Sequence, residues 1–204
     1  MNIDSVEFVV SAARADDFPR DGAPEIALAG RSNVGKSSLL NALTGRRVAR
    51  TSASPGKTRL ANFYRVAPAG QPAFYIVDLP GYGYTDSREA RAAFERVASV
   101  YFFGRGGQRR EPRPPICGVI LVIDARHPGL ANDMAAFRWL SALSVSMLVV
   151  ASKADKLGRA ERAGRVAEAE KAFGGPVLPV SATSGENLNK LWSLIVTCLS
   201  QKPR

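Results

Sequence analysis

The sequence predicts an α/β fold in which a mostly parallel sheet lies between two layers of helices. Short apolar runs of strand length alternate with longer segments whose apolar residues recur at helical spacing. Several of the runs are apolar at almost every position, which is typical of strands covered on both faces. The apolar fraction of 46% and charged fraction of 23% are close to the globular average, which excludes a disordered or fibrous chain.

The expected strands are rich in β-branched or aromatic residues and cover 26–29, 62–66, 73–77, 118–123, 145–151 and 177–180. The expected helices cover 36–43, 88–101, 131–143, 159–173 and 187–200. One face of the last helix is apolar throughout, with Leu188, Leu191, Trp192, Ile195 and Leu199. We therefore expect Trp192 to lie in the core.

Length and charge limit the organisation of the chain and its partners. A chain of 204 residues suits one domain, so we expect 1–204 to form a single domain with a short N-terminal extension, 1–23. Lys and Arg number 28 against 18 Asp and Glu, a net charge of +10. This balance favours polyanionic partners such as nucleotides, nucleic acid or an anionic membrane.

The apolar stretches, the first residues and the cysteine spacing together predict an intracellular protein without disulfides or metal clusters. The longest apolar stretch, 116–123, is far too short to span a membrane, and the first residues lack the basic start of a secretory signal. We expect a cytoplasmic protein with no membrane partner. Cys117 and Cys198 have no neighbouring Cys or His at metal-ligand spacing, so both are interpreted as small core side chains.

A phosphate-binding loop follows the strand 26–29 directly. Residues 30–37 read GRSNVGKS, a complete G-x-x-x-x-G-K-S pattern placed between a strand and a helix. Its glycines let successive backbone amides point at a phosphate chain, and the helix N-terminus adds positive charge. Lys36 can reach the β- and γ-phosphates, and the Ser37 hydroxyl can bind Mg²⁺. The expected nucleotide contacts are Gly30, Arg31, Ser32, Asn33, Val34, Gly35, Lys36, Ser37 and Ser38.

A second motif lies one strand and one loop further along the chain. Asp78-Leu79-Pro80-Gly81 follows the strand 73–77. A carboxylate at that strand end suits a Mg²⁺ contact through water, and the Gly81 amide can donate to a γ-phosphate. The sequence therefore predicts that Asp78, Leu79, Pro80 and Gly81 lie at the nucleotide.

The loop before the expected strand 62–66 supplies the remaining candidate, Thr58. Its hydroxyl could reach Mg²⁺ only when a γ-phosphate is present, which would make a switch. The alternative is that Thr58 is merely solvated and that Thr51 or a water fills the place. The expected contacts here are Gly56, Lys57, Thr58, Arg59 and Leu60. Metal ligation is then expected from Ser37, Thr58 and Asp78, and catalysis from Lys36, Thr58 and Gly81.

Two loops at the carboxyl edge of the sheet indicate which base is bound. Ser152-Lys153-Ala154-Asp155 follows the strand 145–151, where ligands bind in open α/β folds. A carboxylate at Asp155 can accept from both the ring N–H and the exocyclic amine of guanine, whereas adenine has no such donor pair. The Lys153 stem can pack over the base. A backbone amide of Val180-Ser181-Ala182 can donate to the guanine carbonyl, so GTP and GDP are the expected ligands.

In this order the motifs resemble those of small Ras-like GTPases, which have a three-layer P-loop NTPase fold. More closely, GRSNVGKSSL at 30–39, SPGKT at 54–58 and DLPGYGY at 78–84 resemble the bacterial EngB family of GTP-binding proteins. The resemblance spans nearly the whole chain. It implies a six-stranded, mostly parallel sheet with one antiparallel strand and a GTPase activity. It also implies a role in assembly of the large ribosomal subunit and a link to normal cell division and septation.

Three positions modify what the resemblance implies. Ser152 stands where Asn or Thr is usual, and because a hydroxyl is retained we expect guanine specificity to survive. Tyr82 occupies the position of a water-orienting Gln, so intrinsic GTP hydrolysis is expected to be slow and to depend on stimulation by the ribosome. Asn33 matches an asparagine that helps to hold a potassium ion in related GTPases, which predicts a modest potassium dependence.

A basic loop offers a surface for RNA. Arg105, Arg109, Arg110 and Arg113 lie in a Gly- and Pro-rich stretch with only Glu111 opposing them. They suit phosphate contacts on the rRNA of a large-subunit precursor, although such a run can also be a merely solvated surface.

The leading hypothesis is a monomeric, GTP-switched assembly factor. The alternative is an RNA-binding or division-associated module that holds GTP as a structural ligand with negligible turnover. A small-molecule kinase is disfavoured because it would leave Asp155 and Ser181 unexplained.

Overall fold

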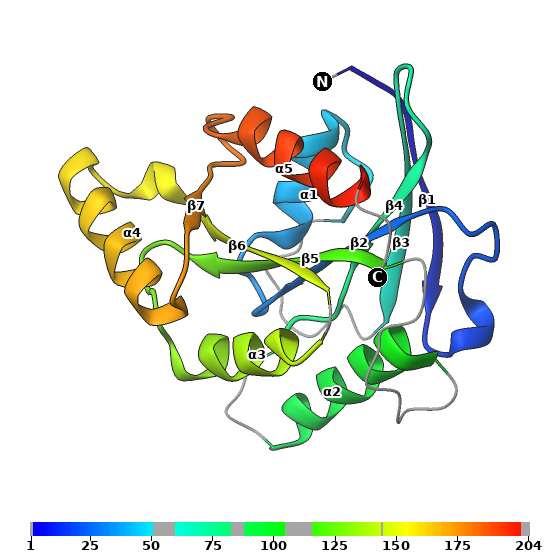
Figure 1. The fold of residues 1–204 in the computed structure, drawn as a ribbon, viewed down its shortest axis with the longest axis horizontal. Helices are drawn as coiled ribbons and strands as arrows, with labels where there is room; N and C mark the ends of the chain where they lie inside the picture. Colours follow the sequence, from blue (N-terminus) through cyan, green and yellow to red (C-terminus); the bar gives the residue numbers. More distant parts are fainter. Residues whose placement is uncertain (1, 51–59, 83–87, 105–115, 144, 201–204) are drawn as a thin grey trace.

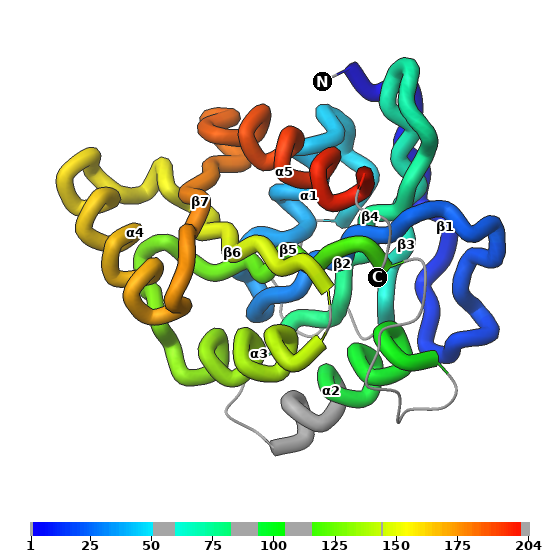
Figure 2. Tube along the Cα trace, in the orientation of Figure 1, coloured from blue at the N-terminus to red at the C-terminus, as the bar shows by residue number. Residues whose placement is uncertain are grey.

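The computed structural model describes residues 2–50, 60–82, 88–104, 116–143 and 145–200 (Figure 2). The predicted residues Gly56, Lys57, Thr58 and Arg59 and the basic residues Arg105, Arg109, Arg110 and Arg113 lie outside these ranges.

One mixed sheet organises the described chain (Figure 1). Its strands are β1 (Ile3–Ala12), β2 (Glu25–Gly30), β3 (Ala61–Pro68), β4 (Phe74–Asp78), β5 (Ile116–Asp124), β6 (Ser146–Ser152) and β7 (Val177–Pro179). They are arranged in the order β1-β3-β4-β2-β5-β6-β7. The β1–β3 and β3–β4 pairs are antiparallel and the remaining pairs are parallel, so β3 runs against the other strands. The expected α/β fold, mostly parallel with one antiparallel strand, is confirmed.

The sheet has seven strands rather than the six expected, because the segment 1–23 contributes β1. This strand pairs with β3 from Ile3 opposite Pro68 to Ala12 opposite Ala61. Ala12 is its one fully buried residue, and Phe8 and Val9 are exposed. This edge strand has only a three-residue apolar run, 8–10, and no strict alternation, so the signals that reveal strands in a sequence are weak in it.

Helices cover both faces of the sheet, which gives three layers (Figure 1). They are α1 (Lys36–Thr44), α2 (Arg88–Phe103), α3 (Ala131–Ser141), α4 (Arg159–Phe173) and α5 (Leu188–Ser200), with short 3-10 turns at Ala15–Asp17 and Ala154–Lys156. Side chains of α1 and α5 pack in one core cluster, and those of α2, α3 and α4 pack in the other. Among the described residues no helix is long and apolar enough to cross a bilayer.

The two cores follow from the alternation of side chains along the central strands. Ile26 and Leu28 face the α1–α5 layer, whereas Ala27 and Ala29 face the α2–α3–α4 layer. Trp192 is 5% exposed, as expected, and its indole Nε1 donates to Leu43 O at 2.8 Å.

Both cysteines are free thiols packed with the core. Cys198 is buried and Cys117 is half-buried, and both belong to or pack against the α1–α5 cluster. Burial raises the pKa of both thiols, as expected of unreactive side chains that fill space.

The parallel strands place the sequence motifs at one edge of the sheet. The carboxyl ends of β2, β4, β5, β6 and β7 lie at that edge. The phosphate loop, the Asp78–Gly81 segment, the Ser152–Asp155 loop and the Val180–Ala182 loop lie at the carboxyl ends of β2, β4, β6 and β7. This is the edge at which open α/β sheets bind ligands.

Candidate nucleotide-binding site

The phosphate loop joins β2 to α1 through a backbone that only glycine can follow at two points. Gly30 has a φ of +156°, and a Cβ on it would lie 2.5 Å from Val122 O. Gly35 has a φ of +108° and precedes the first residue of α1. Glycine is therefore required at both ends of the loop, where L side chains would be strained or would clash.

Lys36 is folded back over this loop. Its Nζ lies 3.0 Å from Gly30 O and 3.2 Å from Arg31 O, and the residue is 8% exposed. Burial lowers the pKa of the Lys36 ammonium, while the neighbouring Asp78 carboxylate acts to raise it. The carbonyl oxygens of Gly30 and Arg31 thus hold the Lys36 ammonium inside the phosphate loop.

Ser37 and Asp78 meet beside Lys36. Ser37 Oγ donates to Asp78 Oδ2 at 3.0 Å, and Asp78 is 2% exposed. Burial raises the pKa of the Asp78 carboxyl, although Lys36 and the Ser37 hydroxyl act to lower it. Its other oxygen, Oδ1, is buried and has no hydrogen-bond partner among the described residues. A buried oxygen with unused acceptor capacity, next to a hydroxyl, fits the oxygen ligands that Mg²⁺ takes.

The segment after β4 runs alongside the phosphate loop. Ser32 N donates to Tyr82 O at 3.0 Å, and Arg31 and Tyr82 form an isolated parallel bridge. A Cβ on Gly81 would lie 2.7 Å from the backbone N and Cα of Ser32. Only glycine allows this approach. The phosphate loop and the Asp78–Gly81 segment are therefore in direct contact. Leu79 and Pro80 are buried behind them.

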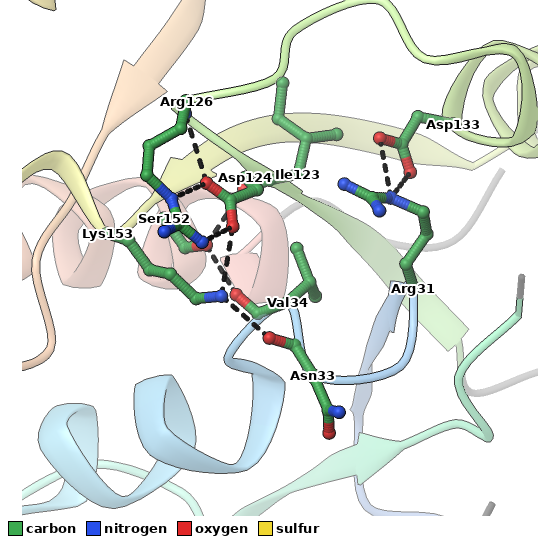
Figure 3. A network of polar contacts seen from close by, with 9 residues as sticks. All are labelled: Arg31, Asn33, Val34, Ile123, Asp124, Arg126, Asp133, Ser152 and Lys153. Carbon is green, nitrogen blue, oxygen red and sulfur yellow. Dashed lines mark hydrogen bonds and ion pairs between the residues drawn. The ribbon is translucent and has the colours of Figure 1, made fainter. Parts of the chain in front are cut away.

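Ser152 and Lys153 connect the β6 loop to the phosphate loop (Figure 3). Ser152 Oγ lies 2.6 Å from Val34 O and 2.9 Å from Ile123 O, and its single proton serves one of these carbonyls at a time. Lys153 Nζ donates to Asn33 O at 2.8 Å. Ser152 therefore uses its hydroxyl to hold the phosphate loop, which explains how serine can stand where Asn or Thr is usual.

Asp124, at the carboxyl end of β5, anchors the Lys153 ammonium. Its Oδ2 accepts from Lys153 Nζ at 3.0 Å, and the Arg126 guanidinium donates to Oδ1 at 2.9 Å and to Oδ2 at 2.7 Å (Figure 3). Burial alone would raise the pKa of the Asp124 carboxyl, but hydrogen bonds from Arg126 and Lys153 hold that pKa well below its usual range. Asp124 was not predicted as a site residue from the sequence, although a carboxylate that ends a buried strand at the ligand-binding edge was a usable signal.

The two predicted base-reading loops lie together. Ser181 Oγ donates to Asp155 Oδ1 at 2.7 Å, and Ala154 N donates to Val180 O at 3.1 Å. The Ser181 hydrogen bond is the main reason that the pKa of the Asp155 carboxyl is lowered. Ser181 Oγ also accepts from the amides of Thr183 and Ser184. The Asp155 carboxylate is thus kept ionised and directed by Ser181, and Ala182 follows Ser181 in the chain.

The described residues predicted for the site therefore converge on one edge of the sheet. The phosphate loop, the Asp78–Gly81 segment, the Ser152–Asp155 loop and the Val180–Ala182 loop are joined by the hydrogen bonds given above. Leu60 is half-buried just before β3. The phosphate loop after β2, the predicted base-reading loop after β6 and the Ras-like sheet together place the chain in the class of P-loop GTPases.

Comparison with known proteins specifies the family. Residues 25–153 match the family model described as "50S ribosome-binding GTPase". The "Probable GTP-binding protein EngB" of Heliobacterium modesticaldum is 42% identical over 91% of this chain and 86% of its own. The protein of the same name from Lactobacillus gasseri is 41% identical over 96% and 98%. The chain belongs to the EngB family of GTP-binding proteins, as the motifs suggested, and it is a GTPase.

A solved structure supports the fold independently. The structure of Era in complex with MgGDPNP and nucleotides 1506-1542 of 16S ribosomal RNA matches with a TM-score of 0.71 and 24% identity. The match covers 91% of this chain and 59% of the Era chain. At this level of identity the likeness concerns the fold.

Proposed function

We propose that the protein is a GTP-operated switch in assembly of the large ribosomal subunit, with slow intrinsic hydrolysis. The main support for a switch is that Gly81 and Tyr82 lie directly against Ser32 of the phosphate loop. A γ-phosphate at that loop would meet the Gly81 segment, whereas GDP would not reach it. The ribosomal role is supported by the description of the matching family model and by the net charge of +10.

Guanine nucleotides are held from two sides in this proposal. Amides of residues 33–38 and the Lys36 ammonium surround the phosphates. Asp155 accepts from the two donors of guanine, and the Lys153 stem covers the base. The Ala182 amide donates to the guanine carbonyl, because the Ser181 amide already donates to Glu186 O. Adenine lacks the donor pair that Asp155 requires, so ATP is excluded.

Mg²⁺ fits at Ser37 and Asp78, because Asp78 Oδ1 is buried with spare acceptor capacity. Thr58 completes the set from outside the described residues. When bound, the ion neutralises charge on the phosphates. Ser37 would hold the ion through its hydroxyl and Asp78 through a water, and Lys36 balances the negative charge of the buried Asp78 carboxylate.

Slow intrinsic turnover follows from the placement of Tyr82. Its hydroxyl donates to Asp133 Oδ1 at 3.1 Å, and the residue is 4% exposed. It therefore does not present a group to orient the attacking water, and the remaining contributions come from Lys36, Thr58 and Gly81. Asn33 is exposed on the phosphate loop, where it could help to hold a potassium ion. Equal turnover in Na⁺ and K⁺ buffers would contradict that role.

The wider setting is proposed from the family and the charge. Residues 1–204 act as one GTPase domain, a cytoplasmic monomer that contacts rRNA through Arg105, Arg109, Arg110 and Arg113. The proposed link to normal cell division and septation rests on the resemblance to the EngB family.

GTP turnover with and without large ribosomal subunits tests this function. We expect slow turnover by the protein alone and faster turnover with subunits. The buried Tyr82 also suits a second function, a module that holds GTP as a structural ligand. Guanine-selective binding without any stimulation would favour that module and contradict the switch, and stimulation would exclude it.

A further inference from the structure

A buried carboxylate joins the two segments that meet in front of the phosphate loop. Asp133, in the first turn of α3, is 0% exposed. Both of its carboxylate oxygens lie 3.1 Å from Arg31 Nε (Figure 3). Its Oδ1 also accepts the Tyr82 hydroxyl at 3.1 Å. We call this arrangement of Arg31, Asp133 and Tyr82 the Asp133 tie.

Aromatic side chains of the neighbouring helices pack at the Tyr82 end of the tie. The Tyr82 ring lies edge-on to Phe94 of α2 at 5.1 Å between ring centroids. Phe94 in turn contacts Trp139 of α3 at 6.4 Å. Burial raises the pKa of the Tyr82 hydroxyl well above its usual value. The hydroxyl therefore stays protonated and donates to Asp133.

The two ends of the tie flank the contact between Ser32 and Gly81. Arg31 precedes Ser32, and Tyr82 follows Gly81. The main chains of Arg31 and Tyr82 form a parallel bridge, and the Gly81 approach leaves no space for a Cβ. The side-chain tie and the backbone bridge therefore fix the Gly81 amide relative to the phosphate loop.

A separate network supports the base and the rest of the loop. Lys153, Ser152 and Asp124 hold Asn33 and Val34, and Ser181 holds Asp155. The tie acts instead on Arg31 and on the residue after Gly81. Loss of the Asp133 tie should therefore affect the contact between Gly81 and a γ-phosphate, which GTP makes and GDP does not.

We propose that Asp133 is a positioning residue which, by tying Arg31 to Tyr82, holds Gly81 ready for a γ-phosphate and so sets the preference for GTP over GDP. The inference rests on the GTP-dependent switching proposed above. Without the tie, Gly81 must be ordered each time GTP binds, and GTP affinity falls by that ordering cost. GDP has no γ-phosphate to meet Gly81, so its affinity stays the same.

Tyr82→Phe tests the tie by removing one hydroxyl while keeping the ring against Phe94. Affinities for GDP and for a non-hydrolysable GTP analogue are measured with Mg²⁺ by fluorescent-nucleotide titration. We expect the analogue to bind about fivefold more weakly or worse, with GDP affinity within about twofold of the wild type. Asp133→Asn, which removes the charge and keeps the size, should shift the ratio in the same direction.

Tyr75→Phe is the matched control. The Tyr75 hydroxyl also donates to an aspartate oxygen, Asp21 Oδ2, at 3.1 Å, and Tyr75 is 4% exposed. It lies near the amino end of β4, beside Pro24 and Glu25, at the opposite end of the strand from Asp78. Its loss should leave the ratio of the two affinities unchanged, whatever it does to thermal stability.

The proposal is overturned if Tyr82→Phe and Asp133→Asn change both affinities equally, or change neither, in protein shown to be folded by its thermal transition. That result would make the tie a purely structural contact. The ratio is measured without ribosomes, whereas the proposed function is tested by stimulation of wild-type turnover with subunits. The two ideas can therefore fail separately.

Discussion

Removing the Ser152 hydroxyl should destabilise the protein well beyond the average effect of a serine-to-alanine change. Ser152 is 5% exposed, and Val34 is 2% exposed. The hydroxyl lies 2.6 Å from Val34 O and 2.9 Å from Ile123 O. Alanine leaves these carbonyls without that donor, in a place that water does not easily reach.

The loss of stability in Ser152→Ala follows from desolvation of a buried carbonyl, Val34 O or Ile123 O, that has lost its donor. A buried polar group that loses its partner costs about 1–3 kcal/mol. In a domain of this size each 1 kcal/mol lowers the unfolding midpoint by roughly 2–4 °C, so Ser152→Ala should lower it by roughly 2–12 °C. Thermal and urea unfolding of the nucleotide-free protein measure the effect.

Two variants separate this hydrogen bond from the general effect of the substitution. Ser193→Ala makes the same change on an exposed turn of α5, where the hydroxyl donates only to Asn189 O, and we expect a shift of about 0.5 kcal/mol or less. Ser152→Thr keeps the hydroxyl and should keep most of the stability. If Ser152→Ala unfolds at the same temperature as Ser193→Ala, the Ser152 hydroxyl does not hold the phosphate loop.

Three further predictions concern carboxylates of the site. Asp155→Asn removes the charged acceptor for two guanine donors, so competition titration should show GTP affinity falling by about 100-fold or more, with xanthine nucleotides gaining relative to guanine; an unchanged base preference would contradict the base-reading role. Asp78→Asn should reduce the gain in GDP affinity that Mg²⁺ gives, measured by titration with and without chelator; an undiminished gain would place the ion elsewhere. The pKa of Asp124 is lowered in the folded state, so its stabilisation is complete above the unfolded pKa of about 3.9 and is lost as pH falls below it. The difference in free energy of unfolding between wild type and Asp124→Asn should therefore be constant from about pH 7 to pH 5 and shrink in acid, and a difference already falling between those values would contradict the ion pairs.

The sequence predicted the parts of this molecule that depend on local chemistry. The glycines at 30 and 35 and the apolar central strands were readable because a tight loop and a doubly covered sheet each demand particular residue types. Placing Asp78 and Asp155 at strand ends was enough to predict that they converge, since the carboxyl ends of parallel strands share one edge.

What the sequence did not reveal depends on contacts between distant segments. Asp133 has the appearance of an ordinary acidic residue in the first turn of a helix, where it favours the dipole. Its partners are 102 and 51 residues away in the chain, and no local pattern announces them. Strand β1 was missed because its exposed face carries both polar and apolar side chains, and its place in the sheet comes from hydrogen bonds to β3.

In the proposed function, GTP controls contact between the protein and the large ribosomal subunit. Co-sedimentation of the wild-type protein with purified large subunits tests it most directly, with a non-hydrolysable GTP analogue, with GDP and without nucleotide. We predict a subunit complex with the analogue and little binding with GDP or without nucleotide. Equal binding in all three conditions, or none in any, would contradict the claim.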